Sequence, residues 1–321
     1  MRPYISIVLP VYNEAGNLEN LFARLINTLD QLNKPYEIIF SNDGSIDNSM
    51  EILTKLYKER PAQVRIIDFR RNFGQHMAVI AGFELAAGEI IVTLDSDLQN
   101  PPEEIPKLLE LIEKGHDLVS GVRLHERQDN WFRRNVSILV NKVRALTTNL
   151  KMTDHGCMLR AYKRNVIDLM LASNECCVFI PALAYTYATN PAEVKVNHEA
   201  RFAGQSKYRL YDLIRLNFDL MTGYSTLPLQ MFTLFGLSIA CLSVIFVIFL
   251  VIRRLIIGPE AQGVFTLFAI LFFLVGVALT GLGIMGEYIG RIYKEVQHRP
   301  RFAIKQIIGK NIDEKTSHPR N

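Results

Sequence analysis

Gly88-Glu-Ile-Ile-Val-Thr-Leu-Asp-Ser-Asp-Leu-Gln-Asn100 is the stretch that decides the fold of this 321-residue chain. Its first half is an apolar, β-branched run that begins at a glycine, a pattern typical of a buried strand. Because side chains alternate along an extended chain, Asp95, Asp97 and Gln99 are expected to point the same way at the end of that strand. Three oxygen-bearing groups there suit a hard cation such as Mg2+ or Mn2+. The feature suggests chemistry on a nucleotide-linked substrate, whose diphosphate charge the cation can take up.

Three further strand and helix pairs come before this stretch. Apolar runs predict strands at 5–10, 36–40 and 64–69, and helical spacing predicts helices at 14–32, 48–60 and 75–87. Repeated βα units imply an α/β fold with a mostly parallel sheet covered on both faces. In such sheets ligands bind beyond the carboxyl ends of the strands. The residues that follow the four strands are therefore expected to converge on one crevice: Asn13, Asp43, Arg70 and Asp95.

Two short motifs follow the first two predicted strands. Pro10-Val-Tyr-Asn-Glu14 precedes a helix, where its Asn and Glu can simply act as helix caps. Asn42-Asp-Gly-Ser45 can be a plain turn. Since both motifs end strands of one sheet, a second interpretation stays open. In that interpretation their side chains accept hydrogen bonds from a uracil N–H or from ribose hydroxyls.

The middle of the chain, about 120 to 228, is less regular. Helices are predicted at 131–150 and 208–221, each with basic and apolar faces. They either pack on the sheet or lie in a membrane interface. Arg201-Phe-Ala-Gly-Gln-Ser-Lys-Tyr208 is either a solvated loop or a clamp for a lipid phosphate, because cations and a hydroxyl bind phosphate oxygens well.

Two apolar segments follow, at 231–252 and 264–286, and neither contains a charged residue. Each exceeds the roughly 20 residues that span a hydrocarbon core. The short connection between them predicts a hairpin, which places the catalytic part and the basic tail from Arg291 on the cytoplasmic side. Arg253 and Arg254 count weakly against that orientation. The Gly281–Gly286 motif has the GxGxxG pattern, but no strand precedes it, so helix packing is the better explanation.

Composition narrows the remaining classes. The mean hydropathy is slightly positive, and the apolar excess lies after residue 229. The four cysteines form no CxxC pair, which argues against a zinc site or a disulfide framework. A net charge of +4 without a basic stripe argues against a nucleic-acid partner. The N-terminus begins directly with a strand pattern, so no signal peptide is expected.

Taken together, these motifs resemble family 2 glycosyltransferases of the polyprenyl-phosphate type, which have a GT-A fold. The matching segments are Pro10–Glu14, Asn42–Ser45, Arg71–Gly74, Leu94–Gln99, Gly121–Arg123 and Arg201–Tyr208. A closer, nearly full-length likeness is to the bacterial subgroup that transfers 4-deoxy-4-formamido-L-arabinose to undecaprenyl phosphate. It rests on Asn100–Pro106, Arg127–Arg133, Gly156–Tyr162, the two apolar segments and Gly286–Tyr293. Asn42 and His155 depart from the family pattern, which has Asp and Tyr there.

The resemblance implies a GT-A (Rossmann-like, mostly parallel sheet) catalytic domain at 1–210 and an interfacial helix or linker at 211–228. Two transmembrane helices within 229–290 and a cytoplasmic tail at 291–321 would follow. The protein would be a multi-pass enzyme of the bacterial inner membrane. Small-residue faces in the two apolar segments permit assembly, so a homo-oligomer is expected as well. Its product would serve lipid A modification and polymyxin resistance.

The implied reaction is inverting sugar transfer from a UDP-sugar donor to undecaprenyl phosphate, in contact with membrane lipid. The resemblance implies a divalent metal, Mg2+ or Mn2+, bound by Asp97 and Gln99 with Asp95 beside it. Nucleotide-sugar contacts would come from Pro10, Tyr12, Glu14, Asn42, Asp43, Asp95 and Ser96. Acceptor-phosphate contacts would come from Arg123, Arg134 (or Arg133), Arg201, Ser206 and Lys207. The catalytic set would be Asp95, Asp97, Arg123, Arg134, Arg201 and Lys207.

Of three alternative functions, one stays open and two are disfavoured by the sequence. A polyprenyl-phosphate glucosyl- or mannosyltransferase would use UDP-glucose or GDP-mannose through the same motifs. A processive polysaccharide synthase is disfavoured, because its Gln-x-x-Arg-Trp motif is missing around Trp131, the single tryptophan. A membrane-anchored protein that binds sugar nucleotides without turnover is disfavoured by Asp95, Asp97 and Gln99.

Overall fold

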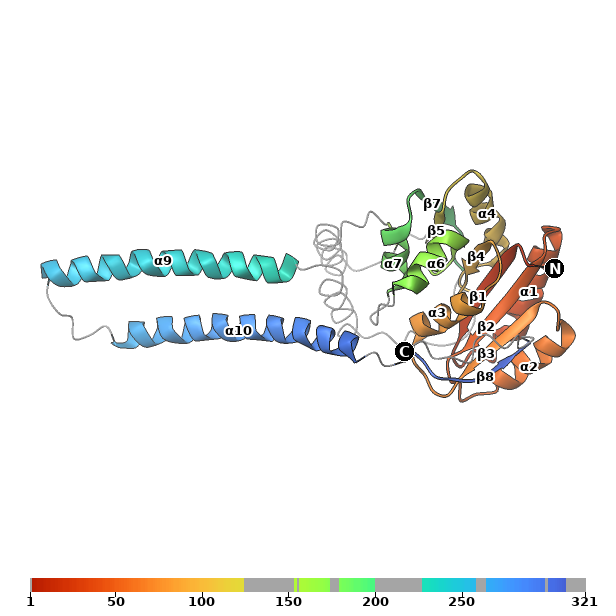
Figure 1. Ribbon diagram of the computed structural model, residues 1–321, viewed down its shortest axis with the longest axis horizontal. Helices are drawn as coiled ribbons and strands as arrows, with labels where there is room; N and C mark the ends of the chain where they lie inside the picture. The colour runs from red at the N-terminus through yellow and green to blue at the C-terminus, as the bar shows by residue number, and fades with distance from the viewer. Residues whose placement is uncertain are drawn as a thin grey trace. The chain divides into compact units, whose positions relative to one another are not determined.

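The computed structural model describes residues 2–123, 153–154, 156–173, 179–199, 227–257, 264–297 and 300–309. The chain divides into two compact units. The sheet unit comprises residues 1–129, 150–207 and 300–321, and the helical unit comprises residues 130–149 and 208–299. Figure 1 shows the strands of the first unit and the two long helices of the second.

An eight-stranded sheet forms the centre of the sheet unit, in the order β7-β5-β6-β4-β1-β2-β3-β8. Its four central strands, in the order β4-β1-β2-β3, are parallel to their neighbours. Strand β6 is antiparallel to β4 and β5, β7 is parallel to β5, and β8 is antiparallel to β3. The strands are β1 Ile5–Val11, β2 Tyr36–Asn42, β3 Val64–Phe69, β4 Ile90–Thr93, β5 Leu118–Arg123, β6 Arg160–Lys163, β7 Pro191–Val196 and β8 Ile304–Ile308.

Helices cover both faces of this sheet (Figure 1). One layer contains α1 Leu18–Gln31, α2 Ser49–Glu59 and α4 Ile105–Glu113, with the short 3-10 helix η1 Pro102–Glu104 before α4; the other contains α3 Gln75–Leu85, α6 Arg164–Ala172 and α7 Ile180–Tyr187. Alternate residues of β1 feed the two cores, since Leu9 packs toward α1 and Val8 packs toward α3. The prediction of a mostly parallel sheet buried on both faces is confirmed.

The first helix begins later than the sequence pattern predicted. Helix α1 starts at Leu18, whereas apolar spacing predicted a start at Glu14. Asn13 has a positive φ of 56°, a backbone conformation that a helix does not allow. The residues between β1 and α1 therefore form a turn, and their backbone groups are available for contacts with the next loop.

The sequence did not predict the strand at the C-terminal edge of the sheet. Strand β8 lies beside β3, where the backbone N–H of Arg70 donates to the carbonyl of Ala303 at 3.0 Å. Phe302 stacks on Phe69 with ring centroids 5.1 Å apart. The segment Ile304-Lys-Gln-Ile-Ile308 lacks the alternation of apolar and polar residues that marks a half-buried strand, so its periodicity gave no signal.

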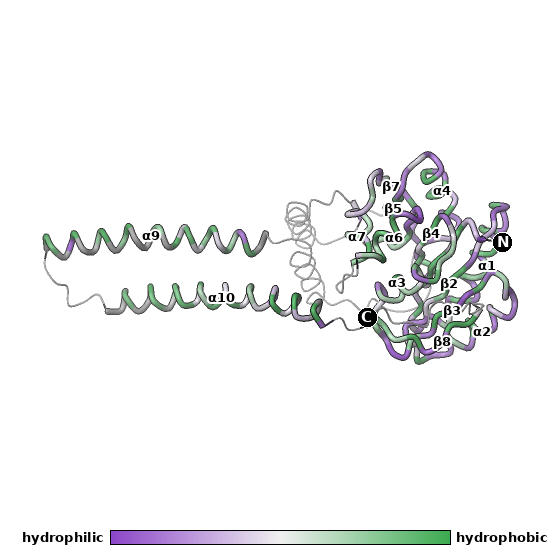
Figure 2. The backbone as a smooth tube through the Cα atoms, in the orientation of Figure 1, coloured by the Kyte–Doolittle hydropathy of each residue, from purple (hydrophilic) through white to green (hydrophobic). Residues whose placement is uncertain are grey.

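The helical unit contains two long apolar helices, α9 Leu227–Ile257 and α10 Val264–Val296. They include both predicted apolar segments, and Figure 2 shows them hydrophobic along most of their described length. Their large side chains are exposed, among them Leu234, Leu271 and Leu282, at 64%, 50% and 62%. Exposed apolar surface of this extent is expected where lipid replaces water. Within the part of the chain that the structure covers, Phe273–Gly290 is the stretch long and apolar enough to cross a bilayer.

A close contact between the two helices explains part of the glycine pattern in α10. A Cβ added at Gly281 would lie 2.3 Å from the ring of Phe232 in α9. A side chain at this position would require the Phe232 ring to move, which agrees with the helix-packing interpretation of the Gly281–Gly286 motif.

Candidate functional site

The loops after β1 and β2 are joined by reciprocal hydrogen bonds. The Asn13 N–H donates to Ser45 Oγ at 3.0 Å, and the Ile46 N–H donates to Asn13 Oδ1 at 2.9 Å. The Glu14 N–H donates to Ser49 Oγ at 3.0 Å. The two predicted motifs therefore form one rigid rim at the carboxyl end of the sheet.

Asp43, expected to contact the nucleotide, holds the segment between β3 and α3 in place. Its two carboxylate oxygens accept the backbone N–H groups of Phe73 at 2.7 Å and Gly74 at 2.9 Å. The residue is 2% exposed, and burial raises the pKa of its carboxyl group against the opposing effect of those two hydrogen bonds. Its main contacts are thus internal to the protein.

Asn42, which departs from the family pattern, is also held internally. Its Nδ2 donates to Asp68 Oδ1 at 2.8 Å, and its Oδ1 accepts the Ser45 N–H at 3.3 Å. Both Asn42 and Asp68 are nearly fully buried. A carboxylate in place of the Asn42 amide would put two like charges together in a buried site, which is costly. The neutral side chain therefore suits its position beside Asp68.

The acids after β4 lie on a turn, because the strand ends at Thr93. Asp97 Oδ1 accepts the backbone N–H of Gln99 at 3.1 Å, and Leu98 between them has a positive φ of 62°. Asp95 Oδ1 accepts a hydrogen bond from Gln75 Nε2 at 2.6 Å. The expected alternation along an extended strand does not apply here. A turn brings the three oxygen-bearing side chains into one short segment instead.

Ser96 joins this turn to the first strand. Its Oγ donates to the carbonyl of Pro10 at 2.8 Å, and the residue is 3% exposed. The β1 and β4 ends are neighbours in the sheet, so this hydrogen bond fixes one against the other. Tyr12, two residues after Pro10, has a 39% exposed side chain beside the same edge.

Arg123 at the end of β5 forms a two-point ion pair with Asp154. The distances are 2.7 Å from Nε to Oδ2 and 2.8 Å from Nη2 to Oδ1. These hydrogen bonds raise the pKa of Arg123, and the nearby Asp95 carboxylate adds to the effect. Burial alone would raise the pKa of Asp154, but the hydrogen bonds from Arg123 and Gly156 lower it to about 2. Arg123 is thus a fixed cation near the acids that follow β4.

A cavity of about 580 Å³ opens at the ends of β2 and β3. Its lining combines polar, charged and apolar residues, and it consists of Asn42, Gly44, Ser45, Ile46, Met50, Asp68, Phe69, Arg70 and Lys305. Gly44 has a positive φ of 66°, and a Cβ there would lie 2.5 Å from the Arg71 backbone. The wall between the two loops therefore requires glycine.

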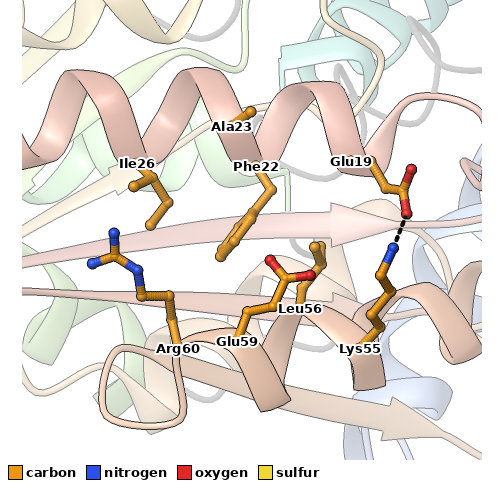
Figure 3. Close-up of a pocket in the computed structure, with 8 residues that line it drawn as sticks. All are labelled: Glu19, Phe22, Ala23, Ile26, Lys55, Leu56, Glu59 and Arg60. Atoms are coloured by element: carbon orange, nitrogen blue, oxygen red, sulfur yellow. Dashed lines mark hydrogen bonds and ion pairs between the residues drawn. The ribbon is translucent and has the colours of Figure 1, made fainter.

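A second groove lies away from the strand ends, between α1 and α2 (Figure 3). Its volume is about 290 Å³, and Lys55 pairs with Glu19 across it at 2.8 Å. Its lining comes from helix surfaces and includes none of the predicted site residues.

The donor atoms after β4 fit a hard divalent cation. Asp95, Asp97 and Gln99 supply two carboxylates and one amide on a single turn, and Mg2+ or Mn2+ prefers such oxygen ligands. Across the residues that the structure describes, no three His, Cys, Asp or Glu side chains gather closely enough to hold a metal by themselves. The residues of this turn are therefore candidates to hold such an ion.

With this geometry in view, comparison with known proteins identifies the family. The model of glycosyl transferase family 2 matches residues 6–170. The chain belongs to glycosyltransferase family 2. It is 46% identical over 310 residues to the undecaprenyl-phosphate 4-deoxy-4-formamido-L-arabinose transferase of Edwardsiella ictaluri, covering 96% of this chain and 95% of that protein. The protein of the same name from Aeromonas hydrophila is 47% identical over 306 residues, covering 95% and 94%.

Solved structures of other glycosyltransferases are more distant. Glucosyl-3-phosphoglycerate synthase of Mycobacterium tuberculosis, in complex with Mn2+, UDP-glucose and phosphoglyceric acid, is 19% identical, with a TM-score of 0.46. It covers 68% of this chain and 78% of that one. The family assignment and the sheet topology together confirm the predicted GT-A fold and the prediction that the protein is a glycosyltransferase enzyme.

Several predicted glycosyltransferase site residues lie outside the described residues. They are Arg133, Arg134, Arg201, Ser206 and Lys207, together with His155 and the helices predicted at 131–150 and 208–221. Sequence reasoning missed Asp68, Gln75, Asp154 and Lys305, which contact or surround the predicted site residues. Asp68 lies one residue before the end of β3, so the rule about strand ends could have found it, and Gln75 begins α3 on the loop that follows. Nothing in the sequence pairs Asp154 with Arg123 or Lys305 with Asp68.

Proposed function

We propose that this enzyme transfers 4-deoxy-4-formamido-L-arabinose from its UDP-linked form to undecaprenyl phosphate, with inversion at the anomeric carbon. The observation that carries the proposal is the likeness to transferases of that name, which continues through both apolar helices over at least 94% of either chain. A likeness confined to the sheet would support only a nucleotide-sugar enzyme. Likeness across the helices also supports a lipid-linked acceptor.

The donor's uridine would occupy the cavity at the ends of β2 and β3. Its polar lining offers hydrogen-bonding partners for a base and a ribose, and Phe69 and Met50 offer apolar surface. Asn42 and Asp43 would shape this cavity by holding Asp68 and the segment after β3. Pro10, Tyr12 and Glu14 belong to the adjoining rim, and Ser96 of the β4 turn donates a hydrogen bond to Pro10 of that rim.

The diphosphate would lie toward the turn that follows β4. Asp97 and Gln99 would hold a Mg2+ or Mn2+ ion there, with Asp95 oriented beside it by Gln75. When bound, the ion would neutralise charge that builds on the β-phosphate as UDP leaves. The hydrogen bond between Ser96 and Pro10 would hold this turn at a fixed position relative to the rim formed by the loops after β1 and β2.

The acceptor requires positioning more than activation. A phosphate monoester is already anionic near neutral pH, so it needs no strong general base. The enzyme must hold the acceptor in line with the donor and offset the repulsion between the two phosphate groups. Arg123, fixed by Asp154 near Asp95, would supply one cation. Arg134, Arg201, Ser206 and Lys207 are proposed to complete this set, and Arg133 can replace Arg134.

The helical unit would anchor the enzyme in the bacterial inner membrane. In this proposal α9 and α10 both cross the bilayer, and the catalytic part faces the cytoplasm, where sugar nucleotides are found. A Cβ added at Gly236 or Gly276 would meet none of the described atoms within 4 Å. Such narrow helix faces permit close packing against another copy, which supports a homo-oligomer. The product would serve lipid A modification and polymyxin resistance.

A screen of donors against undecaprenyl phosphate tests the proposal. Purified enzyme with Mg2+ or Mn2+ would be given the UDP-linked formamido-arabinose, UDP-glucose or GDP-mannose, and lipid-linked product would be measured. We expect product with the first donor only. Product with UDP-glucose or GDP-mannose alone would make the enzyme a glucosyl- or mannosyltransferase. Donor binding without product or UDP release in any combination would indicate a non-catalytic binding protein.

A further inference from the structure

The strand that follows the membrane helices brings a cation to the donor cavity. Lys305 of β8 lines the cavity at the ends of β2 and β3. Its Nζ lies 3.5 Å from Asp68 Oδ2, and Gln306 Nε2 lies 3.4 Å from the same oxygen. Asp68 is 3% exposed, whereas the Lys305 side chain is 64% exposed. The ammonium group therefore has a fixed partner on one side and open cavity on the other.

The pairing of β8 with β3 fixes where this lysine lies. Residues Ile66, Ile67 and Asp68 pair in antiparallel register with Ile308, Ile307 and Gln306. Beyond that ladder, Phe302 stacks on Phe69 and the Arg70 N–H bonds to Ala303. Contacts on both sides of Lys305 thus hold its backbone against the cavity wall.

Sheet geometry places Lys305 at the nucleobase end of the proposed donor. Adjacent strands lie about 4.8 Å apart, so the β3 edge is roughly 14 Å from β4 and β8 is farther still. An extended nucleoside diphosphate spans a distance of that order. If the diphosphate lies at the β4 turn, the group that reaches β3 and β8 is the base.

We propose that Lys305 binds the uracil end of the donor, donating a hydrogen bond from its ammonium group to a uracil carbonyl oxygen. The inference rests on the proposed use of a UDP-sugar. Asp68 holds the lysine at the cavity and remains bonded to Asn42 and Gln306 when the ammonium turns toward the base. A segment beyond the second membrane helix thereby becomes part of the donor site.

Binding of UDP to the full-length enzyme in detergent tests this assignment. Isothermal titration would compare the wild type with Lys305→Ala and Lys305→Gln, with and without Mn2+. We expect Lys305→Ala to raise the Kd for UDP about fivefold, because a charge-assisted hydrogen bond is lost from a partly exposed site. The factor by which Mn2+ strengthens binding should be the same in both proteins, since the lysine acts far from the diphosphate.

Lys55→Ala is a matched control, because the Lys55 side chain is also 64% exposed and also pairs with a carboxylate, Glu19, in the other groove. This control should bind UDP as the wild type does. An unchanged Kd in both Lys305 variants, or a loss confined to the Mn2+ effect, would overturn the assignment. Absence of UDP binding in the wild type would instead count against the proposed function. If Lys305→Gln unfolds at the same temperature as the wild type, misfolding is excluded as the cause of its weaker UDP binding.

Discussion

Two strand ends that look alike in sequence differ in structure. Asn42-Asp43 at the end of β2 and Asp95-Ser-Asp97 after β4 are both segments with acidic residues at the ends of buried apolar strands. Asp43 is 2% exposed, and two backbone N–H groups bind its carboxylate. Asp95 is half-buried and is held by a side-chain amide, and Arg123 lies nearby. Asp43 is thus held by the backbone of a separate segment and maintains the scaffold, whereas Asp95 is held by a side chain near a fixed cation, and we propose that the β4 acids serve the substrate.

One short segment connects these two strand ends. The backbone of Phe73 and Gly74 is bound by Asp43, and the next side chain, Gln75, binds Asp95. The β2 acid therefore positions the β4 acid through the start of α3. Substitution of an acid after β4 should therefore mainly reduce activity, whereas substitution of Asp43 after β2 should mainly reduce stability.

The largest expected effect is that of Asp97→Ala on transfer. Loss of a metal ligand commonly costs several kcal/mol of charge stabilisation, so activity should fall about a thousandfold, or about 4 kcal/mol. Stability should fall much less than activity, because the hydrogen bond that Asp97 accepts from the Gln99 N–H lies within its own turn. Lipid-linked product and thermal unfolding would both be measured.

Glu110→Ala is the control for that variant, because it removes an acid whose side chain is 65% exposed and pairs with Lys114 on the surface of α4. Wild-type activity is expected. Transfer by Asp97→Ala within a few-fold of the wild type would refute the assignment of Asp97 to the metal.

The next effect is that of Asp43→Ala on folding. Two backbone N–H groups would lose their acceptor, and each unsatisfied donor costs roughly 1–3 kcal/mol. We therefore expect the free energy of unfolding to fall by about 3 kcal/mol, with a smaller loss for Asp43→Asn, which retains one acceptor oxygen. Chemical denaturation in detergent measures both. If UDP binding were lost while stability stayed unchanged, Asp43 would be a direct nucleotide contact, as the sequence suggested.

The contrast between these acids shows where sequence reasoning succeeds. Strands β1 to β4 and helices α1 to α3 followed from apolar periodicity, because burial on one or both faces sets that pattern locally. Strand β3 agrees with its predicted bounds, and β1 and β2 run only one or two residues longer. The convergence of residues after strands followed from the rule that parallel strands share a carboxyl edge.

What the sequence could not supply are pairings between distant segments. Whether Asp43 faces a ligand or a backbone depends on the path of residues 73 and 74, which Gly74 with φ of 98° determines. The ion pair of Arg123 with Asp154 joins segments 31 residues apart, and β8 joins β3 from the far end of the chain. No local pattern encodes such partners.

The smallest expected effect concerns pH and His76, the residue that follows the connecting segment. Its ring packs on Phe179 with centroids 5.3 Å apart, and among the described residues nothing hydrogen-bonds its buried Nδ1. Burial, with help from the charge of Arg160, lowers the pKa of His76 from 6.5 to about 4. Between those values the unfolded chain binds a proton that the folded protein does not. Stability is therefore complete above pH 6.5 and decreases as the pH falls toward 4.

By linkage, the protein should lose about 2 kcal/mol of unfolding free energy between pH 7 and pH 5 through this histidine. His76→Leu, which cannot titrate, should lose that pH dependence, whereas His116→Gln, at the surface beside Asn190, should keep it. Denaturation at pH 7, 6 and 5 measures all three proteins. Because His76 adjoins the segment that holds Asp95, transfer by the wild type should decline over the same range. If His76→Leu loses as much unfolding free energy between pH 7 and pH 5 as the wild type does, the acid sensitivity comes from other groups.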